Sequence, residues 1–129
     1  MIYLTTIQVI EIHDTVIRLS GGFPGVKNNG QLDSVLNNIQ NDDSYPSLSD
    51  KMAHLMFSII KSHLFFDGNK RTAIATTSVL LELNGYPLAA ETLPVIFEDI
   101  VVGIAENLIK KEDIKKLIED IINETTLLS

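Results

Sequence analysis

The chain has 129 residues, 45% of them apolar and 21% charged, which is the profile of one soluble globular domain over residues 1–129. It has no cysteine, which excludes disulfides, iron–sulfur clusters and thiolate zinc sites. The net charge of −7 argues against nucleic acid as a partner, because proteins that bind nucleic acid usually carry a basic face.

The hydrophobic pattern gives no sign of a membrane protein. No apolar run approaches the roughly 18 residues that a membrane-spanning helix needs. The first residues lack the basic start of a secretory signal, and Glu11 and Asp14 interrupt their apolar pattern. We therefore expect a cytoplasmic protein with no membrane partner.

The beginning of the chain predicts a helix followed by a loop. Thr5 and Gln8 have the spacing of a capping box, which predicts a helix over residues 6–19. Residues 21–30 are rich in glycine, proline and asparagine, which predicts a loop or a tight hairpin.

Two more helices are predicted before residue 65. Apolar residues at helical spacing predict a short helix over residues 31–40, which ends before Pro46. Ser47 and Asp50 then resemble a cap for a third helix, which runs to about residue 64.

The second half of the chain is also predicted to be helical. A fourth helix is expected from Asn69 to the Asn84–Gly85 stop, and its nearly uncharged surface predicts a buried central helix. A fifth is expected to open at Thr92, with Pro94 in its first turn. The apolar spacing over residues 114–122 predicts an amphipathic sixth helix, so the fold class is an all-α bundle.

The segment HLFFDGNKR, residues 63–71, carries the chemically informative side chains. His63 falls at the end of the third predicted helix, on the side of Ile59 and Ile60. Its ring is therefore expected to point toward the protein rather than into bulk water. A histidine in this position is a candidate general base.

The residues after this histidine predict a site for phosphate and metal. Asp67 and Gly68 form a turn, and Asn69, Lys70 and Arg71 follow in the first turn of the next helix. Free N–H groups at a helix start attract anions, and two cations there are unfavourable unless an anion compensates them. The Asp67 carboxylate suits Mg²⁺. From the residues alone, an ordinary turn followed by a solvated cationic pair stays open as the alternative.

The segment resembles the core motif of the Fic/Doc family, H-x-F-x-(D/E)-G-N-(G/K)-R, and fulfils it throughout. LTTIQVIEIHD (4–14), GGFPGVKNNGQLDSVL (21–36) and LLELNGYPL (80–88) are similar to the death-on-curing (Doc) branch. The resemblance covers about residues 3–90. It implies a compact Fic-fold helical bundle around a buried central helix, with a flap loop or hairpin at about 22–30.

The resemblance also implies roles for single residues. His63 corresponds to the general base that takes the proton of a target hydroxyl, and Asp67 to the Mg²⁺ ligand. An anion hole and phosphate clamp for ATP are implied for four residues, Gly68, Asn69, Lys70 and Arg71. Phe65 corresponds to a buried plug, and the flap to a device that aligns an extended target segment by main-chain pairing. His13 is expected to be structural, hydrogen-bonded against the core.

Two departures from the wider family favour a kinase. Lys70 stands where most Fic adenylyltransferases have glycine, and Ile74 stands where they have a second arginine. Both resemble Doc, which transfers the γ-phosphoryl of ATP to a threonine of translation elongation factor Tu. We therefore expect a Doc-like toxin kinase that inhibits translation. A Fic adenylyltransferase and a non-catalytic Fic-fold interaction module are the alternatives.

The inhibitory helix of many Fic enzymes, (S/T)-x-x-x-E-(G/N), does not occur in this sequence. Glu106 is the only glutamate followed by glycine or asparagine, and Val102 stands where the motif needs serine or threonine. Control is therefore expected from an antitoxin protein acting in trans, as in Doc-like systems.

Overall fold

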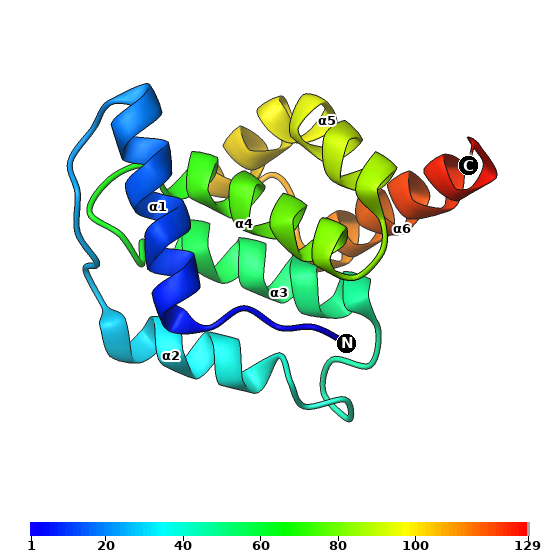
Figure 1. Cartoon of the computed structure of the whole chain (residues 1–129), viewed down its shortest axis with the longest axis horizontal. Helices are drawn as coiled ribbons and strands as arrows, with labels where there is room; N and C mark the ends of the chain where they lie inside the picture. The colour runs from blue at the N-terminus through cyan, green and yellow to red at the C-terminus, as the bar shows by residue number, and fades with distance from the viewer. Residues whose placement is uncertain (129) are drawn as a thin grey trace.

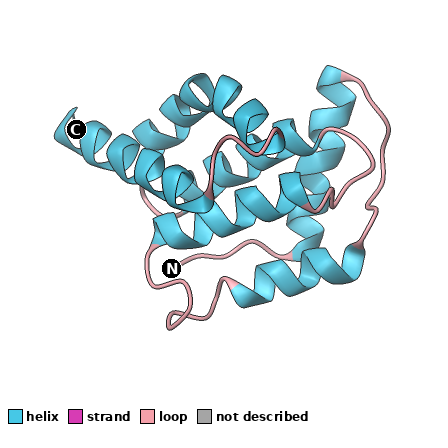
Figure 2. Ribbon diagram, turned by 180° about the vertical axis from the view of Figure 1, so that it is seen from behind, coloured by secondary structure: helices cyan, strands magenta, loops and turns pink. Residues whose placement is uncertain are grey.

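Six helices form in the computed structural model, which describes residues 1–128: α1 Thr6–Ser20, α2 Asn29–Asn38, α3 Leu48–Lys61, α4 Asn69–Leu83, α5 Pro87–Ala105 and α6 Lys111–Leu128 (Figure 1). Figure 2 shows these helices joined by loops alone. Over residues 1–128, β-type pairing is limited to one antiparallel bridge between Val26 and Phe65. The predicted all-α fold is confirmed. None of these helices is long and apolar enough to cross a membrane.

Local side-chain caps determine where the first three helices start. The Thr5 hydroxyl accepts the Gln8 N–H, while the Gln8 side chain accepts the Thr5 N–H, which confirms the predicted capping box. Ser47 and Asp50 form the same reciprocal pair at the start of α3. The second helix begins two residues before its predicted start, because the Asn28 side chain caps it.

The predicted start of the fifth helix at Thr92 is wrong, because α5 begins at Pro87. Proline is favourable at the first helical position, since its ring fixes the backbone angle that a helix needs. Pro94 then lies inside the helix, where it cannot donate to the Ala90 carbonyl. The Ser78 hydroxyl of α4 donates to this carbonyl instead, at 2.5 Å, so the acceptor keeps a partner.

Helix α4 lies in the middle of the bundle, as predicted, and packs against α1, α3 and α5 (Figure 1). Its side chains from Thr72 to Leu81 are all buried or half-buried. The helix ends at Leu83, followed by Gly85 in the left-handed backbone region at φ +91°. Helix α4, which begins with the last three residues of the motif, is therefore held in place by three neighbouring helices.

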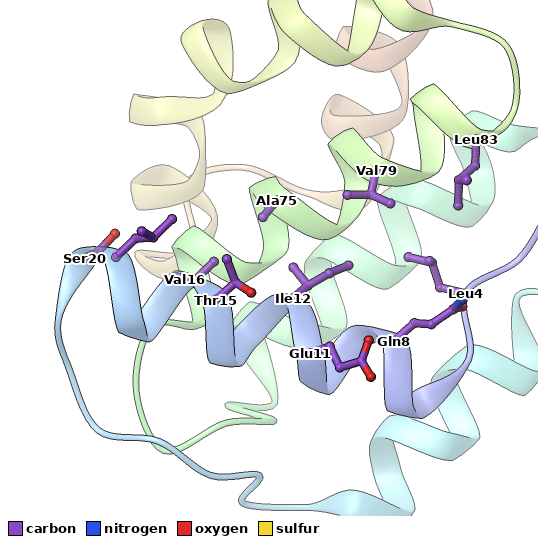
Figure 3. A pocket seen from close by; sticks show the side chains of 11 residues that line it. Leu4, Gln8, Glu11, Ile12, Thr15, Val16, Ser20, Ala75, Val79 and Leu83 are labelled. Carbon is purple, nitrogen blue, oxygen red and sulfur yellow. The ribbon is translucent and has the colours of Figure 1, made fainter.

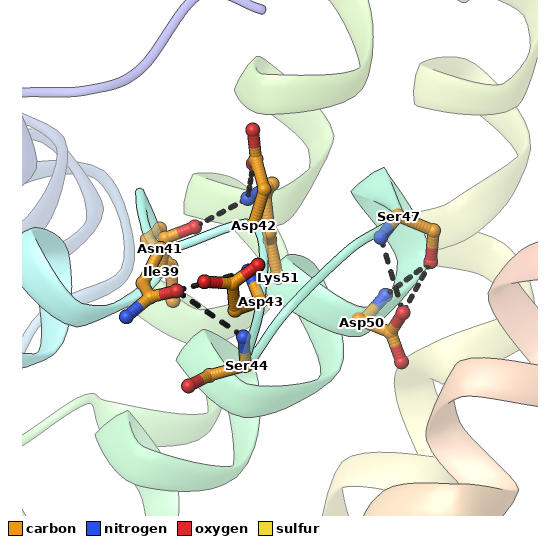
Figure 4. A network of polar contacts seen from close by, with 8 residues as sticks. All are labelled: Ile39, Asn41, Asp42, Asp43, Ser44, Ser47, Asp50 and Lys51. Carbon is orange, nitrogen blue, oxygen red and sulfur yellow. Dashed lines mark hydrogen bonds and ion pairs between the residues drawn. The ribbon is translucent and has the colours of Figure 1, made fainter.

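A buried lysine connects α3 with the segments that precede it (Figure 4). Lys51 is 2% exposed, and its Nζ donates to the Ile39 carbonyl and to the Asp42 carboxylate, both at 2.7 Å. Burial alone would lower the pKa of Lys51, but hydrogen bonds to Asp42 and Tyr3 raise it above its ordinary value. The contact fixes the end of α2 against the base of α3.

Candidate functional site

Helix α3 ends in a Schellman motif that has His63 at its left-handed position. The His63 N–H donates to Ile60 O and the Leu64 N–H to Ile59 O, both at 3.4 Å, and φ of His63 is +46°. The prediction that His63 ends the helix and points toward the protein is wrong. The helix stops at Lys61, and the His63 side chain is exposed, because the reversed backbone turns it out of the helical path.

The same motif ends α4 and α5, with glycine and asparagine at the left-handed position. Gly85 occupies the left-handed position after α4, and Asn107, at φ +64°, occupies it after α5. Glycine adopts this region freely, whereas a residue with a Cβ loses roughly 1–2 kcal/mol there, although asparagine and histidine adopt it more often than most. The histidine is therefore held in a strained backbone position, a condition common at functional sites.

Phe65 anchors the loop that follows. Its side chain is 1% exposed, and its ring stacks on that of His13, with centroids 4.0 Å apart and planes at 9°. The Asn69 side chain holds both backbone groups of Phe65: Oδ1 accepts its N–H at 3.0 Å, and Nδ2 donates to its carbonyl at 2.9 Å. The Asn69 amide thus faces the loop, and what Asn69 can offer an anion is its own backbone N–H.

The flap is a loop rather than a hairpin, and it pairs with the motif itself. The Lys27 N–H donates to Leu64 O at 2.8 Å, and the Phe66 N–H donates to Gly25 O at 3.2 Å. These main-chain groups are already used within the chain. Any pairing of the flap with an extended target would have to use other groups of residues 22–30.

Asp67 is held as a carboxylate by two backbone donors. The Phe23 N–H donates to Oδ2 at 3.0 Å, and the Gly68 N–H donates to Oδ1 at 2.8 Å. These hydrogen bonds lower the pKa of Asp67 below its ordinary value, and the positive charge of Arg71 adds to the effect. The carboxyl group is therefore ionised near neutral pH and keeps lone pairs free for a cation.

The start of α4 has the features of an anion site. Gly68 is the N-cap, at φ +71°, and no side chain caps the helix. The backbone N–H groups of the first turn are therefore left without a capping acceptor, at the positive end of the helix dipole. Arg71 lies against Gly68, and its Nη1 donates to Gly21 O at 3.0 Å.

A pocket of about 190 Å³ brings five of the six predicted site residues together. It is lined by Ile60, His63, Phe66, Asp67, Gly68, Asn69, Lys70 and Ala105. Arg71, the sixth, lies outside this lining, beside Gly68. Ala105 was not predicted, because it follows the part of the chain that carries the resemblance, and alanine gives no chemical signal. The contact of Phe23 with Asp67 was also missed, although the Gly21–Gly22 pair marks the turn that allows it.

Over residues 1–128, no three His, Cys, Asp or Glu side chains gather into a metal site. Asp67 is thus a single carboxylate beside a cationic helix start. Mg²⁺ is commonly held in this way, by one or two carboxylates together with substrate phosphates and water.

Comparison with known proteins identifies the family. The model of the Fic/DOC family matches residues 3–81, and the chain belongs to this family. The chain is 41% identical over 75 residues to Toxin Doc of Mycolicibacterium smegmatis (strain ATCC 700084 / mc(2)155), a match that covers 55% of this chain and 58% of that protein. It is 28% identical over 88 residues to Protein kinase doc of Escherichia phage P1, covering 66% of this chain and 70% of that protein. The matched segment thus spans little more than half the length of the mycobacterial relative.

The glycine beside Asp67 provides a direct test of how the carboxylate is held. A Cβ at Gly22 would lie 2.6 Å from Asp67 Oδ2, so Gly22→Ala must displace the carboxylate from the Phe23 N–H. We expect the pKa of Asp67 to rise toward its ordinary value in this variant. The wild-type carboxylate then stays charged to a lower pH than that of the variant. An NMR titration that follows the chemical shift of the Asp67 carboxyl carbon measures its pKa in the wild type and in the variant.

Gly21→Ala is the matched control. Gly21 also has a positive φ, of +82°, but a Cβ there would meet nothing within 4 Å. The two variants therefore share backbone strain and differ in the clash with Asp67. Equal pKa values for Asp67 in the two variants would show that the carboxylate does not depend on the Phe23 contact.

Proposed function

We propose that this chain is a Doc-like toxin that transfers the γ-phosphoryl group of ATP to a serine or threonine hydroxyl of a protein. One observation carries the proposal: His63, Asp67 and Lys70 line one pocket at the uncapped start of α4. This pocket combines a base, a carboxylate for Mg²⁺ and a cationic anion site. The names of the two relatives, a toxin and a protein kinase, support both parts of the proposal.

The residues present fit a magnesium nucleotide. A Cβ at Gly68 would lie 3.2 Å from Arg71 Nη2, so glycine leaves room for the guanidinium beside the helix start. The N–H groups of Asn69 to Arg71 and the Lys70 ammonium would bind phosphate oxygens. Asp67 would hold the metal ion. When bound, Mg²⁺ would neutralise charge on the phosphates.

The proposed step is an in-line displacement at the γ-phosphorus. The target hydroxyl oxygen forms a bond to phosphorus, and its proton passes to a ring nitrogen of His63. The bond between the γ-phosphorus and the bridging oxygen breaks, and ADP leaves. Because His63 is exposed at the pocket wall, a hydroxyl on another protein can reach it. A general base of this kind contributes roughly 10²–10⁴-fold to the rate.

Lys70 favours phosphoryl over nucleotidyl transfer. Its side chain lines the pocket, where a glycine would leave space for an α-phosphate. Ile74, one turn later on α4, has no charge with which to hold that phosphate. We propose elongation factor Tu as the target, on the resemblance to Doc, with inhibition of translation as the consequence. A cytoplasmic location is part of this proposal, since ATP and elongation factor Tu are found there.

The mass added to the target distinguishes the proposed reaction from its alternatives. With ATP, Mg²⁺ and elongation factor Tu, we expect a gain of about 80 Da, from one phosphoryl group, in the intact mass spectrum. Adenylylation would add about 329 Da, and a non-catalytic module would add nothing. Either of these results for the wild-type chain would contradict the kinase.

The substitution His63→Gly tests whether His63 is the general base. Glycine suits the left-handed position, as Gly85 does after α4, so the variant is expected to keep the fold. Its transfer rate should fall by roughly 10²–10⁴-fold at an unchanged melting temperature or a higher one. A folded His63→Gly protein that transfers at the wild-type rate would exclude His63 as the base.

We further propose that an antitoxin binds the groove between α1 and α4 (Figure 3). This cleft has a volume of about 580 Å³, and most of its lining is apolar. Ile12 and Val16 project into it from α1, and Ala75, Val79 and Leu83 from α4. These residues recur at helical spacing on both walls, which suits the apolar face of an amphipathic helix. The Glu11 carboxylate at the rim favours a basic residue on that helix.

The position of the groove explains how its occupant would inhibit the site. Leu19 and Ser20 line one end of the cleft, and Gly21 follows directly. The Gly21 carbonyl accepts a hydrogen bond from the Arg71 guanidinium, and two residues later the Phe23 N–H donates to the Asp67 carboxylate. A helix seated in the groove therefore reaches the loop that positions the carboxylate and the phosphate-binding arginine.

A charge placed in the groove tests this surface. Val79→Glu should keep the transfer activity but abolish neutralisation by a co-expressed antitoxin, because a carboxylate would be buried against an apolar helix. Val102→Glu is the control, since it places the same charge on a partly exposed valine of α5, away from the groove. Growth arrest by Val79→Glu, but not Val102→Glu, during co-expression is the expected result. Neutralisation of both variants would contradict the groove.

A further inference from the structure

His13 contacts the candidate site although it lies far from the motif in sequence. It belongs to α1, its side chain is 0% exposed, and its ring stacks on Phe65. Its Nε2 lies 2.8 Å from the backbone carbonyl oxygen of Asp67. His13 is hydrogen-bonded inside the protein, as expected. Its partner, however, belongs to the loop of the candidate site and not to the hydrophobic core.

The chemistry of this contact fixes the direction of the hydrogen bond. A carbonyl oxygen can only accept, so Nε2 of His13 must carry the hydrogen. The other ring nitrogen, Nδ1, is buried and has no partner within residues 1–128. A hydrogen on Nδ1 would thus be buried without an acceptor, which favours the tautomer with its hydrogen on Nε2.

The bond also fixes the orientation of one peptide group. No cis peptide bond occurs in residues 1–128, so the Asp67 carbonyl and the Gly68 N–H point in opposite directions. With the carbonyl turned inward to His13, the N–H points to the Asp67 carboxylate, where it donates to Oδ1 at 2.8 Å. If this peptide were reversed, a carbonyl oxygen would face the anion site and repel phosphate.

This peptide needs a constraint because glycine leaves it free to rotate. Gly68 stands at φ +71°, and without a Cβ it adopts positive and negative φ with similar ease. The Asn69 side chain holds Phe65, but it makes no bond to the Asp67–Gly68 peptide. Of the side chains in residues 1–128, the one that binds the Asp67 carbonyl is His13.

We infer that His13 is a positioning residue, which holds the Asp67–Gly68 peptide so that its N–H donates to the Asp67 carboxylate and its carbonyl oxygen points away from the phosphate-binding side. The inference rests on the proposed function, since it assumes that phosphate binds at the start of α4. It assigns to α1 a direct part in the site, in addition to packing.

Two substitutions separate hydrogen bonding from packing. His13→Phe keeps an aromatic ring against Phe65 and removes the donor. His13→Gln loses the ring, but its terminal amide can donate from about the place of Nε2. Val9→Ala is the matched control: Val9 is also fully buried on α1, one turn earlier, and it is not among the residues that line the pocket.

The first measurement does not depend on activity. Hydrogen exchange of the Gly68 amide, followed by NMR, reports whether its bond to Asp67 Oδ1 persists. We expect exchange to accelerate roughly tenfold or more in His13→Phe relative to Val9→Ala, and to slow again in His13→Gln, since exchange tracks local opening. Equal exchange in His13→Phe and Val9→Ala, both folded, would overturn the inference.

The second measurement is the transfer reaction. In His13→Phe we expect kcat/KM for ATP to fall roughly 10²-fold, mainly through a higher KM, because phosphate binding is misaligned. Val9→Ala should change only the folded fraction, and so lower the apparent kcat at an unchanged KM. His13→Gln should recover part of the loss. An unchanged KM for ATP in folded His13→Phe would overturn the positioning role.

The two measurements separate the two proposals. If the wild-type chain transfers no phosphoryl group, the proposed function fails, while Gly68 exchange still tests the bond from His13. If His13→Phe does not fold, the comparison of His13→Gln with Val9→Ala takes its place. The inference is supported if the Gly68 amide of His13→Gln exchanges more slowly than the loss of stability of that variant predicts. It is overturned if the exchange rate is the one that the loss of stability alone predicts.

Discussion

The site depends on the burial of Phe65, a single apolar side chain in a short loop. The seven residues between α3 and α4 include a carboxylate, a glycine and an exposed histidine, and would have many conformations by themselves. Burial of Phe65, stacking by His13 and the two hydrogen bonds from Asn69 reduce these to one. A buried phenylalanine contributes about 1.5–3 kcal/mol, which offsets part of the conformational entropy that the loop loses on folding.

The inner and outer sides of the loop between α3 and α4 differ in character. The inner side is apolar and hydrogen-bonded, and it fixes the backbone. The outer side presents groups that a stable protein would avoid: His63 in a left-handed conformation, and two cations at the positive end of a helix. Such groups are useful only if an anion and a proton donor come to them. The local strain at His63 therefore agrees with the proposed chemistry. The packing of α4 against three neighbouring helices stabilises the fold in spite of this strain.

Much of this arrangement could be predicted from the sequence, because it depends on local rules. The Thr5 and Ser47 caps and the Gly85 stop follow from short-range hydrogen bonds and backbone preferences. The motif also placed Asp67 and Gly68 at a helix start. The direction of the His63 ring could not be predicted, because a histidine marks the left-handed position far less reliably than a glycine does. Pro94 lies inside α5 rather than in its first turn, and the Ser78 hydroxyl gives the Ala90 carbonyl a partner through a contact across the bundle that the sequence does not show.

Contacts between distant segments could not be predicted either, because they depend on how the helices pack. The bonds from His13 to Asp67 and from Phe23 to Asp67 join residues more than 40 positions apart. Each depends on how α1 crosses α4, which no local pattern encodes. The motif therefore supplied the chemical groups, whereas the packing of α1 and the flap determines how they are oriented.

The central claim is that nucleotide phosphates bind at the start of α4, and the most direct test is a titration of the ¹⁵N-labelled protein with ATP and Mg²⁺. The account predicts saturable shifts that are largest for the backbone amides of Asn69, Lys70 and Arg71, with His63 also affected. The amides of α6, on another part of the bundle, should not respond. Saturable shifts confined to another surface, or no saturable shift at the start of α4, would contradict it.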